Sequence, residues 1–480
     1  MHTNNSPPLH SRTVSEDYRF RASSFSDSLD RHNYDDGSSN DDNNNNCDGS
    51  NRNNNEPFQI SVAIRKTVTI PDPLQVDRCH RLPEYGPRIL FFSGGSALKN
   101  TSAVLKHYSH NCIHLITPFD SGGSSFELRK AFDMISIGDF RNRLLALADE
   151  SAKVASGSST VRVAALFSHR LHAHDSLLAT VEWQQILSAK HPLIQQVKLP
   201  MRGILLSHLR WFANRMPPDF NLCGASIGNL IITGCFLEHD RDIVTAIYLI
   251  WKLLGVHGIV RPITGANLHI RTYYEKNEFV QRGQHKMGKA ATIEANGRIV
   301  KMDLVASLDD DNDTQQQSAT SCHIDIVSSE MVASADVICF PMGSFFSSVL
   351  VNLLPQGVGT AIVKRHCPKV YIPNAGLDLE MHGYTLLECI EWIIRLVRQD
   401  AGDDVPIKQI LSFVLVDTHN CDYQVDIDKD AIEGQLGIRV LDIPLVGDDD
   451  KRGEGTDGCH EKVTELDPTK VAEVLLTLGS

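Results

Sequence analysis

The sequence predicts an α/β fold with a doubly wound, mostly parallel sheet and a small antiparallel β insertion. Three observations predict it. Short apolar runs end at glycine-containing turns, stretches of helical periodicity separate these runs, and one middle segment alternates polar and apolar residues instead. Short buried strands that alternate with helices form βαβ units, and such units build parallel sheets with helices on both faces.

The first βαβ unit begins at residue 88. The run RILFFS (88–93) stops at Gly94-Gly95, residues 100–108 are helical in pattern, and CIHLIT (112–117) is a second apolar run. A fully buried parallel strand is expected to show such a continuous apolar run. Helical periodicity returns at 140–150, 226–238 and 241–254, and these helices supply apolar faces for the sheet.

Residues 258–306 change the pattern to short alternating runs, and we interpret them as the β insertion. The pair Asn296-Gly297 stands between two of these runs, which is typical of a β-hairpin. An acidic loop, 307–317, follows. The βα rhythm then resumes, with strands expected at 336–341, 369–373, 412–416 and 438–443 and helices at 344–354, 384–398 and 467–478.

The domain order follows from these elements. Residues 1–55 hold twelve Asn and eight Asp but few apolar residues, so we expect a disordered tail. Residues 56–87 are a linker with one strand-like run from Phe58. Residues 88–257 and 318–480 are the two parts of one α/β domain, which the insertion and the acidic loop interrupt.

The charge distribution bears on partners and compartment. The net charge of −13 resides in three segments, 1–55, 303–318 and 447–468, so the remaining chain is close to neutral. No basic face that could follow a phosphate backbone is indicated, which argues against nucleic acid as a partner. No apolar run is long enough to cross a membrane. Eleven cysteines without a CxxC pair favour reduced thiols and a cytoplasmic location.

The loops after the expected strands carry the candidate chemistry, because ligands of open parallel sheets bind beyond the carboxyl ends of the strands. Most of these loops combine Gly with Ser, Asp or Asn, which lets backbone amides and side-chain donors approach a phosphate. The loops are SGGSALKN (93–100), PFDSGGSS (118–125), IGDFRN (137–142), CGASIGN (223–229), PMGSFFSS (341–348) and PNAG (373–376). None contains a Walker A or GxGxxG motif, so a nicotinamide dehydrogenase is not supported.

Seven stretches, most of them in or beside these loops, together resemble one known family, that of the 2-phospho-L-lactate transferases (CofD) and the YvcK-like gluconeogenesis factors. The matching stretches are GGS (94–96), DSGGSS (120–125), GDFRN (138–142), LFSHR (166–170), SIGNLI (226–231), GSFFSSVLVNLL (343–354) and YIPN (371–374). They look closer to the YvcK-like branch. The resemblance implies a Rossmann-like fold from about residue 88 to 442.

The resemblance also implies roles for residues of this chain. Asp120 and Asp139 are the candidate catalytic carboxylates, and Asp120 is the candidate ligand of a Mg²⁺ cofactor. The candidate residues for binding a nucleotide and its phosphates are Gly94, Gly95, Ser96, Gly122, Gly123, Ser124, Ser125, Gly138, Arg141, Asn142, Ser226, Asn229, Gly343, Ser344 and Asn374. The chain departs from the family at Ala97, where Gly is usual, and beside Asp120, where an adjacent acid is replaced by Phe119 or Ser121.

Each candidate also has a structural interpretation. Asp120 also suits a turn that caps the next helix, and Asp139 suits an N-cap equally well. Arg141 also suits a solvated first turn, but the helix dipole disfavours a basic residue there and so favours a functional role. The cluster His169, His172 and His174 suggests a metal, but its spacing of three and two suits no single helix face. His169 is at least as well explained as a structural histidine.

Two functions of different classes stay open. The first is a YvcK-like metabolic regulator that binds a nucleotide or nucleotide sugar, such as a UDP-sugar. The alternative is a Mg²⁺-dependent enzyme of the 2-phospho-L-lactate transferase type, which moves a phosphorylated group from a nucleoside-diphosphate-linked donor to a hydroxyl. The missing acid beside Asp120 favours the binding protein. A homo-oligomer is compatible with either function.

Overall fold

The computed structural model describes residues 17–20, 62–65, 67–149, 159–276, 279–308, 319–447 and 465–480. The chain divides into two compact units, Met1–Val68 and Thr69–Ser480. In the first unit β1 (Asp17–Phe20) pairs antiparallel with β2 (Val62–Arg65). Four residues of the expected tail are therefore a strand, and the other residues of 1–55 lie outside the described part. Strand β2 overlaps the run expected from Phe58.

A seven-stranded parallel sheet forms the centre of the second unit, in the order β12-β11-β10-β9-β3-β4-β5. Its strands are β3 (Ile89–Ser93), β4 (Ile113–Ile116), β5 (Ile259–Pro262), β9 (Val337–Phe340), β10 (Lys369–Tyr371), β11 (Phe413–Val416) and β12 (Arg439–Asp442). Every residue of β3, β4, β9, β10 and β11 is buried. The predicted α/β fold with a parallel sheet is thereby confirmed.

Strand β5 corrects the expected start of the insertion. The insertion was expected over residues 258–306, but β5 is the edge strand of the parallel sheet and pairs with β4. It directly follows a helix, α10 (Ile243–Leu254), and therefore completes a crossover connection back to the sheet. The insertion begins only after β5.

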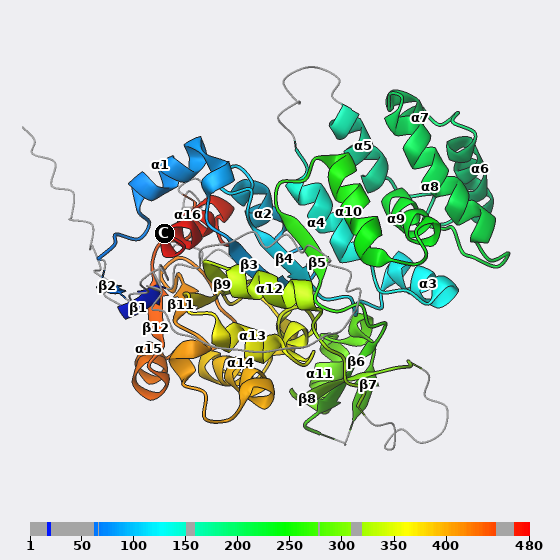
Figure 1. Cartoon of the computed structure of the whole chain (residues 1–480). Helices are drawn as coiled ribbons and strands as arrows, with labels where there is room; N and C mark the ends of the chain where they lie inside the picture. Colours follow the sequence, from blue (N-terminus) through cyan, green and yellow to red (C-terminus); the bar gives the residue numbers. More distant parts are fainter. Residues whose placement is uncertain are drawn as a thin grey trace, which may run out of the picture. The chain divides into compact units, whose positions relative to one another are not determined.

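Helices cover both faces of the sheet (Figure 1). One group comprises α1 (Pro73–Arg81), α2 (Lys99–Leu105) and α16 (Pro468–Leu478), and α16 packs against the other two. The opposite group comprises α12 (Ile326–Ser334), α13 (Val358–Lys364) and α14 (Leu386–Ala401). The short α15 (Lys429–Ala431) precedes β12. Helix α1 lies in the expected linker, where Asp72 caps it and Pro73 occupies its first turn.

A purely helical region lies between β4 and β5 and has its own apolar core, which includes Trp183, Phe212 and Leu230. Its helices are α3 (Gly123–Phe132), α4 (Gly138–Leu147), α5 (Ser159–Ser168), α6 (Ser176–Leu187), α7 (Pro192–Gln196), α8 (Met201–Arg215), α9 (Ile227–Glu238) and α10. Helix α9 is buried along almost its whole length and packs against α8.

The antiparallel insertion is present as a three-stranded sheet in the order β7-β6-β8. Its strands are β6 (His269–Tyr274), β7 (Val280–Arg282) and β8 (Ile299–Val305). The hairpin expected at Asn296-Gly297 is wrong, because Ala290–Asn296 is helix α11 and Gly297 caps it with a φ of 75°. Alanines and Glu294 favour a helix there, and Asn-Gly is also a common helix ending. Most of the acidic loop 307–317 lies outside the described residues.

One further element differs from expectation. Residues 344–354 were expected to form a helix, and the structure has a π-helical turn at Phe345–Val349 followed by a 3₁₀ turn at Leu350–Leu353. Two buried carboxylates from another loop accept the first amides of this segment, as described below. No helix in the described ranges is both long and apolar enough to span a membrane.

The strand order places a topological switch point between β3 and β9. From β3 the chain proceeds through β4 to β5 on one side, and from β9 through β10 and β11 to β12 on the other. The loops after β3 and β9 consequently leave the sheet in opposite directions and open a crevice between them. Ligands of doubly wound sheets bind in this crevice.

Candidate functional site

A cavity of about 240 Å³ lies at the carboxyl ends of β3, β4 and β9, at the switch point. Seven candidate residues line it: Gly94, Gly95, Ser96, Asp120, Asp139, Gly343 and Ser344. The others that line it are Ala97, Leu98, Gln284, Met342, Ser348 and Val349. Loops far apart in sequence therefore meet where the fold predicts a ligand. The roles of these residues remain predictions.

The loop after β3 presents unused donors to this cavity. Within the described part of the chain, the backbone amides of Gly95 and Ser96 donate no hydrogen bond. A Cβ atom on Gly94 would lie 2.8 Å from Ser348 Oγ, so only glycine lets the loop approach the turn after β9 this closely. A Cβ on Gly95 would lie 3.6 Å from Asp139 Oδ1, an ordinary contact. Consecutive free amides of this kind form an anion-binding concavity.

Two carboxylates face the same cavity from different elements. Asp120 follows β4, and its Oδ1 accepts a hydrogen bond from the Gly122 amide at 2.9 Å. Asp139 lies in the first turn of α4. Burial, and then the nearby Asp120 charge, raise the pKa of Asp139 to about 7. Burial also raises the pKa of Asp120. Two acids that disfavour each other's charge are typical of a functional site.

Arg143 is a functional candidate that was not predicted from the sequence. It is fully buried, and its guanidinium donates to the carbonyls of Gly94 at 3.3 Å and Gly95 at 3.4 Å. Burial lowers the pKa of Arg143 to about 10, while the Asp139 charge opposes this shift, so the side chain is positively charged at neutral pH. Asp139 and Arg143 are four residues apart on one helix face, which is the signal that could have found it.

The residues present fit the Mg²⁺ ion that the family resemblance implies. Mg²⁺ prefers oxygen ligands and commonly uses one or two carboxylates together with phosphate oxygens. Asp120 and Asp139 provide such carboxylates in one cavity beside the free amides of the first loop. A divalent cation would also favour the charged form of Asp139, whose pKa burial and the nearby Asp120 charge raise.

Asn374 does not line the cavity but holds one of its loops. Its Oδ1 accepts from the Gly343 amide and its Nδ2 donates to the Gly343 carbonyl, both at 2.7 Å. Nδ2 also donates to Asp378 Oδ2 at 3.0 Å. Asp378 and Glu380 in turn accept the amides of Phe345, Phe346 and Ser347 at 2.9 Å each. Burial and the Asp378 charge raise the pKa of Glu380 to about 7.

Replacing Asn374 by alanine is therefore expected to lower the free energy of unfolding by about 1–3 kcal/mol, because buried partners lose their hydrogen bonds. Urea denaturation of the full chain measures this. The control is Asn221→Ala, since Asn221 caps only the nearby Cys223 amide in an exposed loop. Its expected change is within about 0.5 kcal/mol. Equal effects of the two substitutions would refute the role of Asn374 in holding the loop.

Residues at the start of α3 surround Asp120 without lining the cavity. Gly122 donates to Asp120, and Ser125 also hydrogen-bonds to that carboxylate. A Cβ on Gly138 would lie 2.8 Å from Ser125 Oγ, so Gly138 allows α4 to approach α3. Ser124 lies in the first turn of α3, and Gly123 lines a neighbouring cavity of about 270 Å³ together with Arg170.

Arg141, Asn142 and Asn229 meet beside the cavity. Arg141 donates to Asn229 Oδ1 at 3.1 Å and to Asn142 Oδ1 at 2.8 Å. The exposed first-turn interpretation of Arg141 is wrong, because only 7% of this residue is exposed. Ser226 occupies the N-cap position of the buried helix α9, and its hydroxyl donates to the Phe167 carbonyl at 3.4 Å instead of capping the helix. These residues brace α4 against α9, and none of them lines the cavity.

The β insertion also contributes to the site, which the sequence pattern did not predict. Gln284 lines the cavity, and His285 hydrogen-bonds through Nδ1 to Ser121 Oγ at 2.9 Å. Phe119 and Ser121 flank Asp120, so no acid stands directly beside it in the sequence. In this chain the second carboxylate of the cavity comes from Asp139 instead.

Comparison with known proteins agrees with this geometry. The family model described as 2-phospho-L-lactate transferase CofD matches residues 89–446, which span the sheet and every loop that lines the cavity. The chain belongs to the CofD family. Its closer resemblance to the YvcK-like branch accords with the names of its relatives.

A putative gluconeogenesis factor of Nostoc sp. is 26% identical over 406 residues, which cover 83% of this chain and 70% of that protein. A gluconeogenesis factor of Halalkalibacterium halodurans is 24% identical and the match covers 75% of this chain and 88% of that protein. The crystal structure of a UPF0052 family member from Bacillus halodurans superposes with a TM-score of 0.54 at 21% identity, covering 81% of this chain and 99% of that chain. This chain therefore shares the fold of that protein.

Proposed function

We propose that this CofD-family chain binds a nucleotide or nucleotide sugar through its phosphates, with a UDP-sugar as the leading ligand, and acts as a metabolic regulator. One observation carries the proposal. The free amides of Gly95 and Ser96 and the carboxylates of Asp120 and Asp139 share one cavity at the switch point of the sheet. The names of the relatives, gluconeogenesis factors, support a regulatory role.

The size of the cavity indicates which part of the ligand it holds. Sites for small molecules usually measure about 300–1,000 Å³, and this one measures about 240 Å³. It is large enough for a diphosphate and a metal ion but not for a base and a sugar as well. The phosphates would lie against the Gly95 and Ser96 amides, and Mg²⁺, held by Asp120 and Asp139, would neutralise their charge. The rest of the ligand would extend out of the cavity.

A thermal-shift panel on the full chain tests this proposal. It contains UDP-sugars, UDP, GDP, GTP and GMP, each with and without Mg²⁺. Stabilisation by a UDP-sugar that is not consumed supports the regulator. No shift with any of these ligands would refute nucleotide binding by this chain.

A second candidate function is transfer of the 2-phospho-L-lactate transferase type, and the position of Asp139 favours it. Asp139 supplies the cavity with a second carboxylate beside Asp120, although the two are not adjacent in sequence, so two carboxylates are available for catalysis.

An acceptor hydroxyl oxygen would form a bond to the phosphorus distal to the nucleoside. The bond from that phosphorus to the bridging oxygen would break, and the nucleoside monophosphate would leave. The raised pKa of Asp139 suits it to take the hydroxyl proton. Mg²⁺-dependent release of GMP from a guanine-linked donor would identify this activity.

A further inference from the structure

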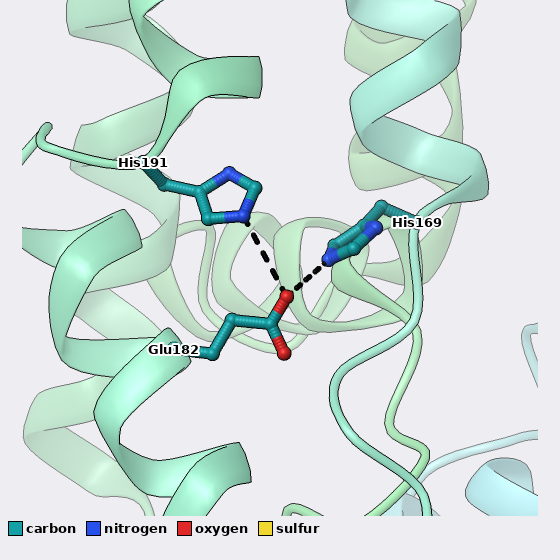
Figure 2. Close-up of side chains that lie close together, drawn as sticks. All are labelled: His169, Glu182 and His191. Atoms are coloured by element: carbon teal, nitrogen blue, oxygen red, sulfur yellow. Dashed lines mark hydrogen bonds and ion pairs between the residues drawn. The ribbon is translucent and has the colours of Figure 1, made fainter.

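Three side chains outside the proposed nucleotide site converge in the helical region, and Figure 2 shows them pointing toward one another. They are His169 in the loop after α5, Glu182 on α6, and His191 at the N-cap of α7. The Nε2 atoms of His169 and His191 lie 2.6 Å and 3.6 Å from Glu182 Oε1. One potential ligand atom from each residue lies within 4.8 Å of the other two.

We propose that His169, Glu182 and His191 together bind one divalent transition-metal ion, with zinc the best match. Two imidazoles and one carboxylate suit zinc, whereas Mg²⁺ prefers oxygen ligands alone. Zinc sites with three protein ligands keep a fourth position for water or another ligand.

The spacing of the ligand atoms suits such an ion. With zinc–ligand distances of about 2.0–2.2 Å, tetrahedral ligand atoms lie about 3.3–3.6 Å apart. The 3.6 Å separation between His191 and Glu182 already has this length. The 2.6 Å hydrogen bond between His169 and Glu182 must lengthen by roughly 1 Å, which side-chain rotation can supply.

Surrounding contacts orient the ligands. Glu182 Oε2 accepts the His172 amide at 3.0 Å, so its other oxygen is left to face the histidines. Metal at His191 Nε2 places the ring proton on Nδ1. Nδ1 would then no longer accept the hydrogen bond from the Leu193 amide, which it receives at 3.3 Å in the metal-free structure.

The ion would join three segments that are separate in sequence, and one of them supports α9. The His169 carbonyl accepts the Ile227 amide at 3.0 Å at the start of that helix. His172 and His174, which the sequence suggested as partners of His169, are exposed and outside the cluster. The actual partners, Glu182 and His191, are brought in by the packing of α6 and α7.

Zinc content of the full chain tests the proposal. Four proteins are stripped with a chelator and dialysed against Zn²⁺: the wild type, Glu182→Gln, His191→Ala and the control His174→Ala. Bound zinc is then counted by mass spectrometry. The wild type and the control are expected to retain one equivalent more than the other two variants, and zinc is expected to raise only their melting temperatures. Equal zinc content in all four proteins would overturn the proposal and leave the cluster a metal-free ion pair.

Cobalt substitution provides a readout that needs no variant. Co²⁺ in the stripped wild-type chain is expected to give the intense visible absorption of a four-coordinate site. If the chain shows no more than the weak absorption of hydrated Co²⁺, the proposal is contradicted. This result stands even if both cluster variants fail to fold. Circular dichroism checks the folding of the variants.

Discussion

Replacing Asp139 by asparagine is expected to lower the affinity for a Mg²⁺–nucleotide ligand by about 10–100-fold. The loss of one charge-assisted contact costs about 1.5–3 kcal/mol, and each 1.4 kcal/mol is a factor of ten. Isothermal titration of the ligand that emerges from the thermal-shift panel, with and without Mg²⁺, measures the effect. Without Mg²⁺ the variant should bind at least as tightly as the wild type, because asparagine removes a negative charge beside the phosphates. An unchanged Mg²⁺ dependence in the variant would remove Asp139 from the site.

The same substitution has an expected effect on the ligand-free chain. The pKa of Asp139 is raised from 3.8 to about 7, so between these values the folded state retains a proton that the unfolded state has released. Stability should therefore fall as the pH rises through this window, and the loss should be complete above pH 7. Asp139→Asn cannot ionise and should show a flatter pH dependence of the free energy of unfolding.

The exposed Asp219 provides the matched control for this pH dependence. Asp219→Asn should keep the wild-type slope, because its charge is solvated in both states. Glu380 contributes a slope of the same sign, so Asp139→Asn should reduce the slope without abolishing it. If Asp139→Asn and Asp219→Asn gave identical slopes, Asp139 would not be the buried acid that the structure indicates.

Gly234→Ala is expected to cause the largest loss of stability, about 3 kcal/mol or more. A Cβ atom on Gly234 would lie 1.9 Å from the backbone oxygen of His208, so α8 and α9 would have to separate. Both helices belong to the core of the helical region, and α9 carries Asn229, which contacts Arg141. Thermal and urea unfolding of the full chain measure the loss.

Gly203→Ala is the control, because a Cβ on Gly203 in α8 would meet only a Leu199 side-chain atom at 4.0 Å. Alanine within a helix is favoured over glycine by about 0.5–1 kcal/mol, so this variant should equal or exceed the wild type in stability. A Gly234→Ala protein as stable as the wild type would contradict the close packing of α8 against α9.

Six of the seven strands of the sheet could be predicted from the sequence because they are short apolar runs, and β5 was the strand assigned wrongly. RILFFS before Gly94-Gly95 is such a case, and β3 occupies residues 89–93. The loops of the site followed from the rule that strand ends meet at one edge. The hairpin at Asn296-Gly297 was predicted wrongly because the same dipeptide occurs both in hairpin turns and at helix ends. Only the alanine-rich residues before it distinguish the two.

The parts of the site that depend on distant contacts could not be predicted. Gln284 reaches the cavity only because the β insertion packs against the loop after β4, through the contact of His285 with Ser121. The same holds for Glu182 and His191, which meet His169 through the packing of separate helices. Local patterns carry no information about such pairings. Arg143 is the exception, since its spacing from Asp139 was visible in the sequence.

The most direct test of nucleotide binding at the switch point is a crystal structure of the full chain grown with a UDP-sugar and Mn²⁺, whose anomalous signal locates the metal. The phosphates are expected against the amides of Gly95 and Ser96, with the anomalous peak between Asp120 and Asp139. A ligand bound elsewhere, or a metal peak away from both carboxylates, would contradict the account.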